Sequence, residues 1–141
     1  MTTPASSDGP AGDALNATRV GVSFTVRDLP HSVAWYCDTL GFTHKQDYAS
    51  DGVLRAVALH AGAIDLLLTQ DNGAKGWDRE KGQGFSLQLT TRQDIDAMAA
   101  RIIQRGGILA TEPTDAFGAR VFRIKDPDGF LLVFTSERPP R

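Results

Sequence analysis

The sequence predicts an α+β fold made of two tandem βαβββ modules. Three features indicate this fold: segments in which apolar and polar residues alternate, two segments with apolar residues at helical spacing, and the recurrence of the whole pattern in the second half of the chain. The glycines expected to end the two helices, Gly41 and Gly106, lie 65 residues apart in a chain of 141 residues. An internal duplication is therefore expected, with one module in each half.

The first predicted module opens with a strand over residues 19–26. Its side chains fall on two faces, an apolar one with Val22, Phe24 and Val26 and a more polar one with Gly21, Ser23 and Thr25. A helix is expected to begin after Asp28, a good N-cap, and to end at Gly41, which can adopt a left-handed C-cap conformation. Three strands should follow, at about 43–48, 53–59 and 63–70.

The second predicted module repeats this order. A strand over 84–90 has Phe85, Leu87 and Leu89 on its apolar face, and a helix should run from about Arg92 to Arg105. Three further strands are expected in the segments ILATEP, ARVFRIK and FLLVFT. The tight turn DPDG, which ends at Gly129, should join the last two strands, since proline presets φ and glycine accepts a positive φ.

The length and the hydrophobic content of 41% fit one domain with a real core. The expected boundaries are a disordered N-terminal tail over 1–17, a single domain over 18–136 and a C-terminal tail over 137–141. Within the domain we expect module 1 at about 18–70, a polar, glycine-rich linker at about 71–83 and module 2 at about 84–136.

Charge and cysteine content exclude several kinds of partner and suggest a compartment. The formal net charge of −2 gives no general attraction to nucleic acid or anionic lipid, so we expect neither nucleic acid nor membrane as a partner. No apolar run approaches the roughly 20 residues of a membrane span, and the N-terminus lacks the features of a signal peptide. With Cys37 as the single cysteine, a reducing, cytoplasmic location is expected.

Two segments together resemble a known family. VSFTVRDLPHSVAWYCDTLGF, followed later by FGARVFRIKDPDGFLLVF, is similar to the vicinal oxygen chelate superfamily of glyoxalase I, bleomycin resistance proteins and extradiol dioxygenases. The resemblance covers residues 18–136. It implies that each module curls its sheet into a half-cup with the helix on the outer face, that the cups enclose the ligand, and that the protein forms a homodimer.

The metal positions that the resemblance implies are filled here by residues that cannot bind a cation. These positions fall at Gly21, Leu67, Gly84 (or Phe85 if the register differs by one) and Val133. The three histidines, His31, His44 and His60, are scattered along the chain. We therefore expect no metal and no other cofactor.

Strand alternation then indicates which side chains line the cup. It places Ser23, Arg55 with Val57, Gln88 and Arg123 there, a mixed wall whose arginines suit an anionic or oxygen-rich small molecule. Arg55 and Arg123 could instead pair with acidic neighbours at the rim. Asp65 is the candidate catalytic carboxylate: burial would raise its pKa and make it a general base, whereas a salt bridge would lower the pKa.

Several aromatic positions remain open between two interpretations. Phe117 and Arg120 fall where the resemblance implies an aromatic-Gly-x-Arg signature beside the cleft, although a simple turn explains them equally well. Trp77 lies in the linker and is interpreted as a lid, a subunit anchor or loop packing. Tyr48 is a further candidate cleft aromatic.

Two functions from different classes follow. The first is a small-molecule binding protein of the bleomycin-resistance type that lacks the metal ligands; bleomycin itself fits poorly, because it is cationic and the predicted cup contains arginines. The alternative is a glyoxalase-like lyase or isomerase, or a dioxygenase-related enzyme, that is metal-free or uses ligands at other positions.

Overall fold

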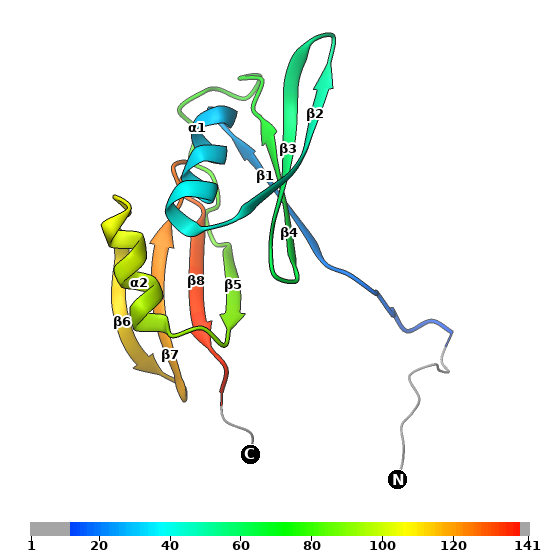
Figure 1. The fold of residues 1–141 in the computed structure, drawn as a ribbon. Coiled ribbons are helices and arrows are strands. Elements are labelled where there is room, and N and C mark those ends of the chain that lie inside the picture. The colour runs from blue at the N-terminus through cyan, green and yellow to red at the C-terminus, as the bar shows by residue number, and fades with distance from the viewer. Residues whose placement is uncertain (1–11, 139–141) are drawn as a thin grey trace.

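The computed structural model describes residues 12–138, which form two modules of the order βαβββ (Figure 1). The first contains β1 (Gly21–Val26), α1 (Leu29–Ala34), the π-helical segment η1 (Trp35–Leu40), β2 (Thr43–Ser50), β3 (Val53–Ala61) and β4 (Ile64–Gln70). The second contains β5 (Ser86–Thr91), α2 (Ile95–Gln104), β6 (Leu109–Ala116), β7 (Ala119–Lys125) and β8 (Leu131–Ser136). The predicted α+β fold with an internal repeat is confirmed.

Each module forms its own four-stranded sheet. The strand orders are β1-β4-β3-β2 and β5-β8-β7-β6, and in each sheet the first pair is parallel and the other pairs are antiparallel. The registers correspond as well, because the parallel ladders begin with Gly21 opposite Asp65 in one sheet and Ser86 opposite Leu131 in the other. The repeat therefore extends to the pairing of individual residues.

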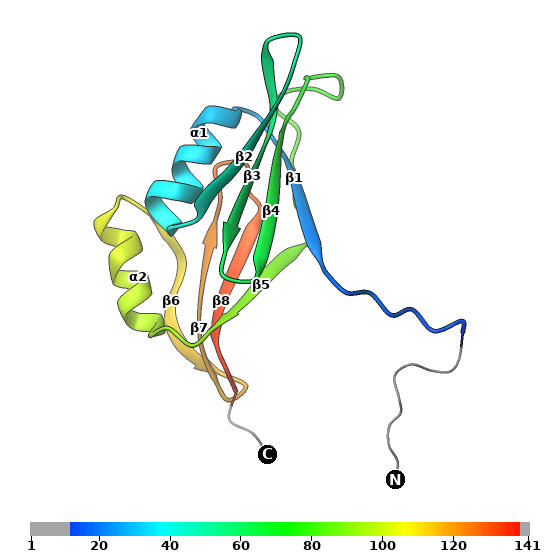
Figure 2. The same ribbon diagram turned by 45° about the vertical axis from the view of Figure 1, so that its right-hand side comes forward.

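The chain before β1 leaves the body of the molecule. Residues 12–20 extend away from both sheets (Figures 1 and 2), and all nine are exposed. Of the two tails expected from the sequence, residues 1–11 and 139–141 lie outside the described residues.

The first helix begins and ends at the predicted residues, although its second half is π-helical. The Asp28 carboxylate accepts a hydrogen bond of 3.1 Å from the His31 amide, as an N-cap does. From Trp35 the helix widens into η1, where the Gly41 amide donates to the Tyr36 carbonyl, five residues back. Gly41 ends this turn at a φ of 91°, a conformation that favours glycine.

One hydrophobic core serves both modules. The helix-facing side chains of the two sheets meet in a single cluster, which includes Phe24, Val57, Leu59, Leu66 and Leu68 from the first module and Leu89, Ile102, Phe122, Ile124 and Leu132 from the second. Both helices lie along the same side of the molecule (Figure 2), and α1 packs on β3 and β4 while α2 packs on β6, β7 and β8. The opposite, concave face of each sheet is left for other contacts.

The predicted alternation of the third strand is wrong. Val57 is 1% exposed and pairs with Leu68, so it faces the helix side instead of the cup. Arg55 lies at a register shift between β2 and β3, and it does not line the cavity on this sheet. Ala56 and Ala58 instead share the concave face with Leu67 and Thr69, their partners in β4. In the segment VLRAVALHA, apolar residues occur at both odd and even positions. The sequence alone therefore does not determine which side of this strand faces the cup.

Buried polar contacts also join the modules. The Tyr36 hydroxyl donates a 2.7 Å hydrogen bond to Asp126 in the turn before β8, and burial raises the pKa of that carboxyl above its ordinary value. In the linker, the buried Lys81 ammonium lies 2.9 Å from Asp71 and 3.3 Å from Asp128. These contacts fix the linker against the end of the β7–β8 turn.

Candidate functional site

The concave face of the first sheet carries a cavity of about 330 Å³. Its lining combines small, apolar and charged side chains: Arg19, Gly21, Ser23, Lys45, Tyr48, Ala58, Asp65 and Leu67 are the residues that face or border it. Ser23 and Leu67 are direct neighbours across the β1–β4 ladder, as are Gly21 and Asp65. The structure therefore brings the predicted residues Ser23 and Asp65 together, with Tyr48 beside them.

Asp65 is held as an anion in this cavity. Its carboxylate accepts a hydrogen bond from the Arg19 guanidinium and lies 3.5 Å from the Lys45 ammonium. The hydrogen bond from Arg19, followed by the charge of Lys45, holds the pKa of Asp65 below its ordinary value. Of the two outcomes that the sequence left open, the salt bridge is the one observed, and an ionised carboxylate paired in this way is a weak base.

Neither cation beside Asp65 was expected from the sequence. Arg19 opens the predicted strand over 19–26 and shares the alternation of Gly21 and Ser23, but it was not among the side chains assigned to the cup; in the structure it precedes β1. Lys45 lies where the register of β2 shifts between His44 and Gln46, and this bulge brings it toward Asp65. The expected partners of Asp65, Arg55 and Arg123, make no ion pair with it.

The concave face of the second sheet has an apolar centre with polar borders. Ala119, Val121 and Val133 form a small buried cluster there, separate from the main core. Gln88 and Arg123 flank Val133 on either side, because both pair with it across the sheet. Toward the linker, a cavity of about 500 Å³ is lined by Ser86, Leu131 and residues 80–85. The predicted orientation of Gln88 and Arg123 agrees with this geometry.

Arg120 does not lie on this concave face. Its guanidinium makes two hydrogen bonds to Asp96 in α2, at 3.1 and 3.0 Å, and a third of 3.2 Å to Asp115. These carboxylates raise the pKa of Arg120 further above its ordinary value. The cleft interpretation of Arg120 is therefore wrong: the side chain ties β7 to α2 on the helix side.

The two remaining aromatic candidates, Trp77 and Phe117, line neither of these cavities. Trp77 is 46% exposed, and its ring lies against Gly73 in the same linker, where an added Cβ would come within 2.5 Å of the ring. Phe117 is 91% exposed at the tip of the β6–β7 turn, with a φ of 51°. The contact with Gly73 agrees with the loop-packing interpretation of Trp77.

The pairing registers of the strands show where the positions of the implied metal ligands lie in the structure. Gly21 and Leu67 lie on the first concave face, and Val133 lies on the second. The parallel ladders begin at Gly21 in the first module and at Ser86 in the second, so Ser86 is the counterpart of Gly21. Gly84 instead precedes β5 in a turn. Phe85 packs edge-on against Phe24 on the core side. Within residues 12–138, no group of three His, Cys, Asp or Glu side chains could hold a metal ion.

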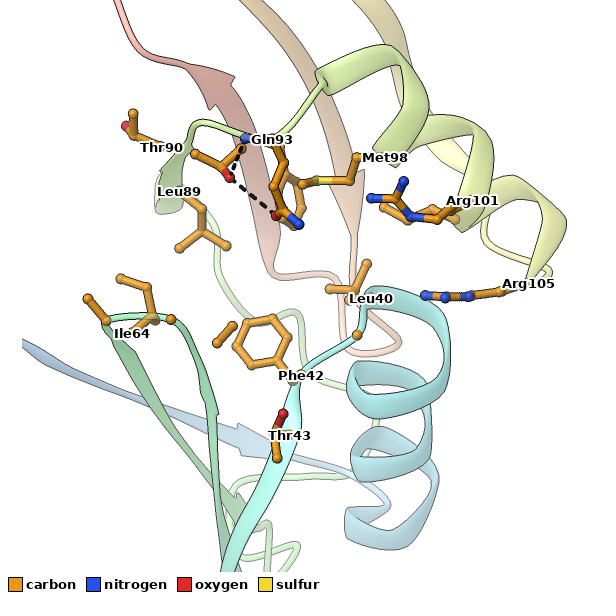
Figure 3. A pocket seen from close by; sticks show the side chains of 17 residues that line it. Leu40, Phe42, Thr43, Ile64, Leu89, Thr90, Gln93, Met98, Arg101 and Arg105 are labelled. Atoms are coloured by element: carbon orange, nitrogen blue, oxygen red, sulfur yellow. Dashed lines mark hydrogen bonds between the residues drawn. The ribbon is translucent and has the colours of Figure 1, made fainter.

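A third cavity, of about 490 Å³, lies between the modules on the helix side of both sheets (Figure 3). It is bordered by the end of η1, the β3–β4 turn, the end of β5 and one face of α2. None of the residues predicted to bind a ligand lines it. No strand alternation could have indicated it, because its walls come from segments that meet only in the folded chain.

The comparisons with known proteins agree with this architecture. A family model described as "Glyoxalase/Bleomycin resistance protein/Dioxygenase superfamily" matches residues 18–134. No curated protein sequence matches this chain. No helix in the described part of the chain is long and apolar enough to span a bilayer.

Several solved structures share this fold. TnmS3, an antibiotic binding protein from Streptomyces sp. CB03234, is 22% identical with a TM-score of 0.69, over 87% of this chain and 98% of that chain. TioX from Micromonospora sp. ML1 is 19% identical with a TM-score of 0.70, over 85% and 98%. A superfamily member from Sphaerobacter thermophilus DSM 20745 is 24% identical with a TM-score of 0.69, over 86% and 98%. By its family match and its fold, the chain belongs to the Glyoxalase/Bleomycin resistance protein/Dioxygenase superfamily.

Proposed function

We propose that the chain is a small-molecule binding protein whose ligand lies on the concave faces of the sheets and requires no metal ion. The cavity on the first sheet carries this proposal, because it places charged groups, a hydroxyl and apolar surface around one space. Such a lining suits an oxygen-rich or anionic molecule with an apolar body. The antibiotic-binding neighbour TnmS3 supports a small-molecule ligand in general.

The side chains at the positions of the implied metal ligands favour binding over metal catalysis. Glycine, leucine and valine at Gly21, Leu67 and Val133 offer no donor atom to a divalent ion, and Ser86 alone is a weak one. The lowered pKa of Asp65 also argues against its use as a general base. Binding is therefore the function that these residues support best.

The cup is proposed to be completed by a second copy of the chain. The cavity on the first sheet is lined only by residues 19–67, so the second module of the same chain does not close it. On the second sheet, Ser86 and Gln88 point from the concave face and are exposed. A cytoplasmic homodimer in which these faces meet would enclose the ligand.

The test uses the anionic aromatic dye 8-anilinonaphthalene-1-sulfonate as a probe. We expect saturable fluorescence enhancement that Ser23→Phe weakens at least about tenfold, because the phenyl ring fills the cavity; this equals about 1.4 kcal/mol. Ser50→Phe, at the far end of β2, is the matched control. Binding that Ser23→Phe leaves unchanged, or no saturable binding at all, would overturn the proposal.

Metal analysis distinguishes the proposed binding protein from the alternative, a metal-dependent enzyme. Protein purified without chelator should contain no stoichiometric manganese, iron, nickel or zinc while it still binds the dye. One such ion per chain would instead support a metal-dependent enzyme.

A further inference from the structure

We propose that the cavity between the modules is a second ligand site, which takes an amphipathic carboxylate: an apolar chain or ring that carries one carboxylate group. This site is distinct from the concave faces, because it lies on the helix side of both sheets (Figure 3). Its volume of about 490 Å³ falls within the usual range for small-molecule sites.

The apolar part of the cavity wall comes from both modules. Leu40, Phe42 and Ile64 belong to the first module, and Leu89, Met98 and Phe134 belong to the second. Phe42, Leu89 and Phe134 are themselves buried, so they form a fixed surface at the base. An apolar ligand body placed here removes its own surface and that of the walls from water, which favours binding.

Two arginines, Arg101 in α2 and Arg105 at its C-cap, line the same cavity. Arg101 and Arg105 are one helical turn apart, and Figure 3 shows both side chains pointing from α2 toward Leu40. The Arg105 guanidinium reaches the first module, since its Nη1 atom lies 3.8 Å from the position of a Cβ built on Gly41. The two guanidinium groups therefore border the apolar base on one side.

Both guanidinium groups lack an acidic partner. None of the ion pairs among residues 12–138 involves Arg101 or Arg105, whereas Arg19, Arg27, Arg79, Arg92 and Arg120 each pair with a carboxylate. Like charges at this helical spacing repel each other. A carboxylate between them would remove the repulsion and accept hydrogen bonds from both planar groups.

The position of Arg101 and Arg105 near the C-terminal end of α2 does not by itself explain why both side chains point toward the cavity. A basic residue in the last turn interacts favourably with the helix dipole wherever its side chain points. Here both side chains point toward an open cavity with an apolar base, which a dipole interaction does not require. Two unpaired cations beside an apolar surface favour a ligand that has both a carboxylate group and an apolar body.

The probe is decanoate, titrated by isothermal calorimetry into the full chain. We expect saturable binding of one molecule per chain, weakened at least about tenfold in the double variant R101Q/R105Q. The neutral analogue 1-decanol should also bind at least about tenfold more weakly than decanoate. The double variant R27Q/K75Q is the matched control, because it removes two exposed charges that do not line this cavity and should bind decanoate like the original chain.

The outcomes separate this site from the concave faces. Ser23→Phe should leave decanoate binding unchanged, and R101Q/R105Q should leave binding of the anilinonaphthalene dye unchanged. The present proposal is overturned if decanoate does not bind, if R101Q/R105Q binds it normally, or if Ser23→Phe abolishes its binding. In the last case the concave-face proposal would still stand.

Discussion

Asp65 shows how single charges define the concave face of the first sheet. A carboxylate on a half-buried strand could act as a base or as an anion, depending on its neighbours. Arg19 and Lys45 decide the outcome here, because both bring positive charge to the carboxylate. The face therefore offers a ligand an ion cluster with one excess positive charge beside Ser23 and Tyr48, not a reactive carboxylate.

Arg19→Gln should raise the pKa of Asp65 toward its ordinary value of about 3.9. The lowered folded-state pKa means that Asp65 stabilises the fold above its ordinary pKa, and that this contribution is lost as the pH falls through the folded-state value. Carboxyl-carbon NMR titration measures the shift directly. Arg92→Gln removes a similar exposed ion pair, to Glu137, and should leave Asp65 unchanged. Identical Asp65 titrations in Arg19→Gln and the original chain would contradict the argument.

At the scale of elements, the end of α2 depends on how closely η1 approaches it. Gly106 leaves the helix at a φ of 90°, and the Gly107 amide donates a 2.9 Å hydrogen bond to the Ile102 carbonyl. A Cβ on Gly107 would lie 2.5 Å from Cγ2 of Ile102 and 3.0 Å from both the Ile102 carbonyl and Cγ2 of Thr39. Both Ile102 and Thr39 are buried, so they have little room to move.

Gly107→Ala should therefore lower the free energy of unfolding by about 1–3 kcal/mol, the usual cost of overpacking. Urea denaturation followed by circular dichroism gives the value. Gly21→Ala is the control, because a Cβ there meets nothing within 4 Å and no positive φ is involved. Equal stability of the two variants would show that the helix ends can separate without cost.

The same elements show what the sequence could and could not predict. The order of strands and helices followed from alternation, caps and the repeat, all of which are local. The inner face of β1 was predicted correctly because its polar and apolar residues alternate, whereas β3, apolar at both parities, was not. The ion pairs of Asp65 and Arg120 depend on a bulge and on the packing of α2, which a pattern along one strand does not contain.

At the scale of the whole molecule, the two modules behave as one folding unit. They share the hydrophobic core, and the stacked rings of Phe24 and Phe130, 4.2 Å apart, lie at the junction. The cavity with Arg101 and Arg105 also spans the junction. A ligand bound there would contact both modules, so decanoate should raise the thermal midpoint as well as bind.

The hydrogen bond from Tyr36 to Asp126 joins the two modules, and its removal gives a way to measure how strongly they depend on each other. Tyr36→Phe leaves the buried carboxylate without its side-chain donor and should cost about 1–2 kcal/mol of unfolding free energy. Burial raises the pKa of Asp126, whereas the bond from Tyr36 lowers it, so the bond favours the ionised form. The cost of Tyr36→Phe should therefore grow as the pH rises through the folded-state pKa of Asp126.

Urea denaturation of Tyr36→Phe at several pH values tests both the cost and its direction. Tyr48→Phe is the matched control: its side chain is 47% exposed and makes no hydrogen bond within residues 12–138, so its removal should change stability by less than about 0.5 kcal/mol at every pH. A single transition, reported alike by probes in both modules, is expected for each variant because the core is shared. Separate transitions in Tyr36→Phe would instead mean that this one bond, more than the apolar core, makes the modules unfold together.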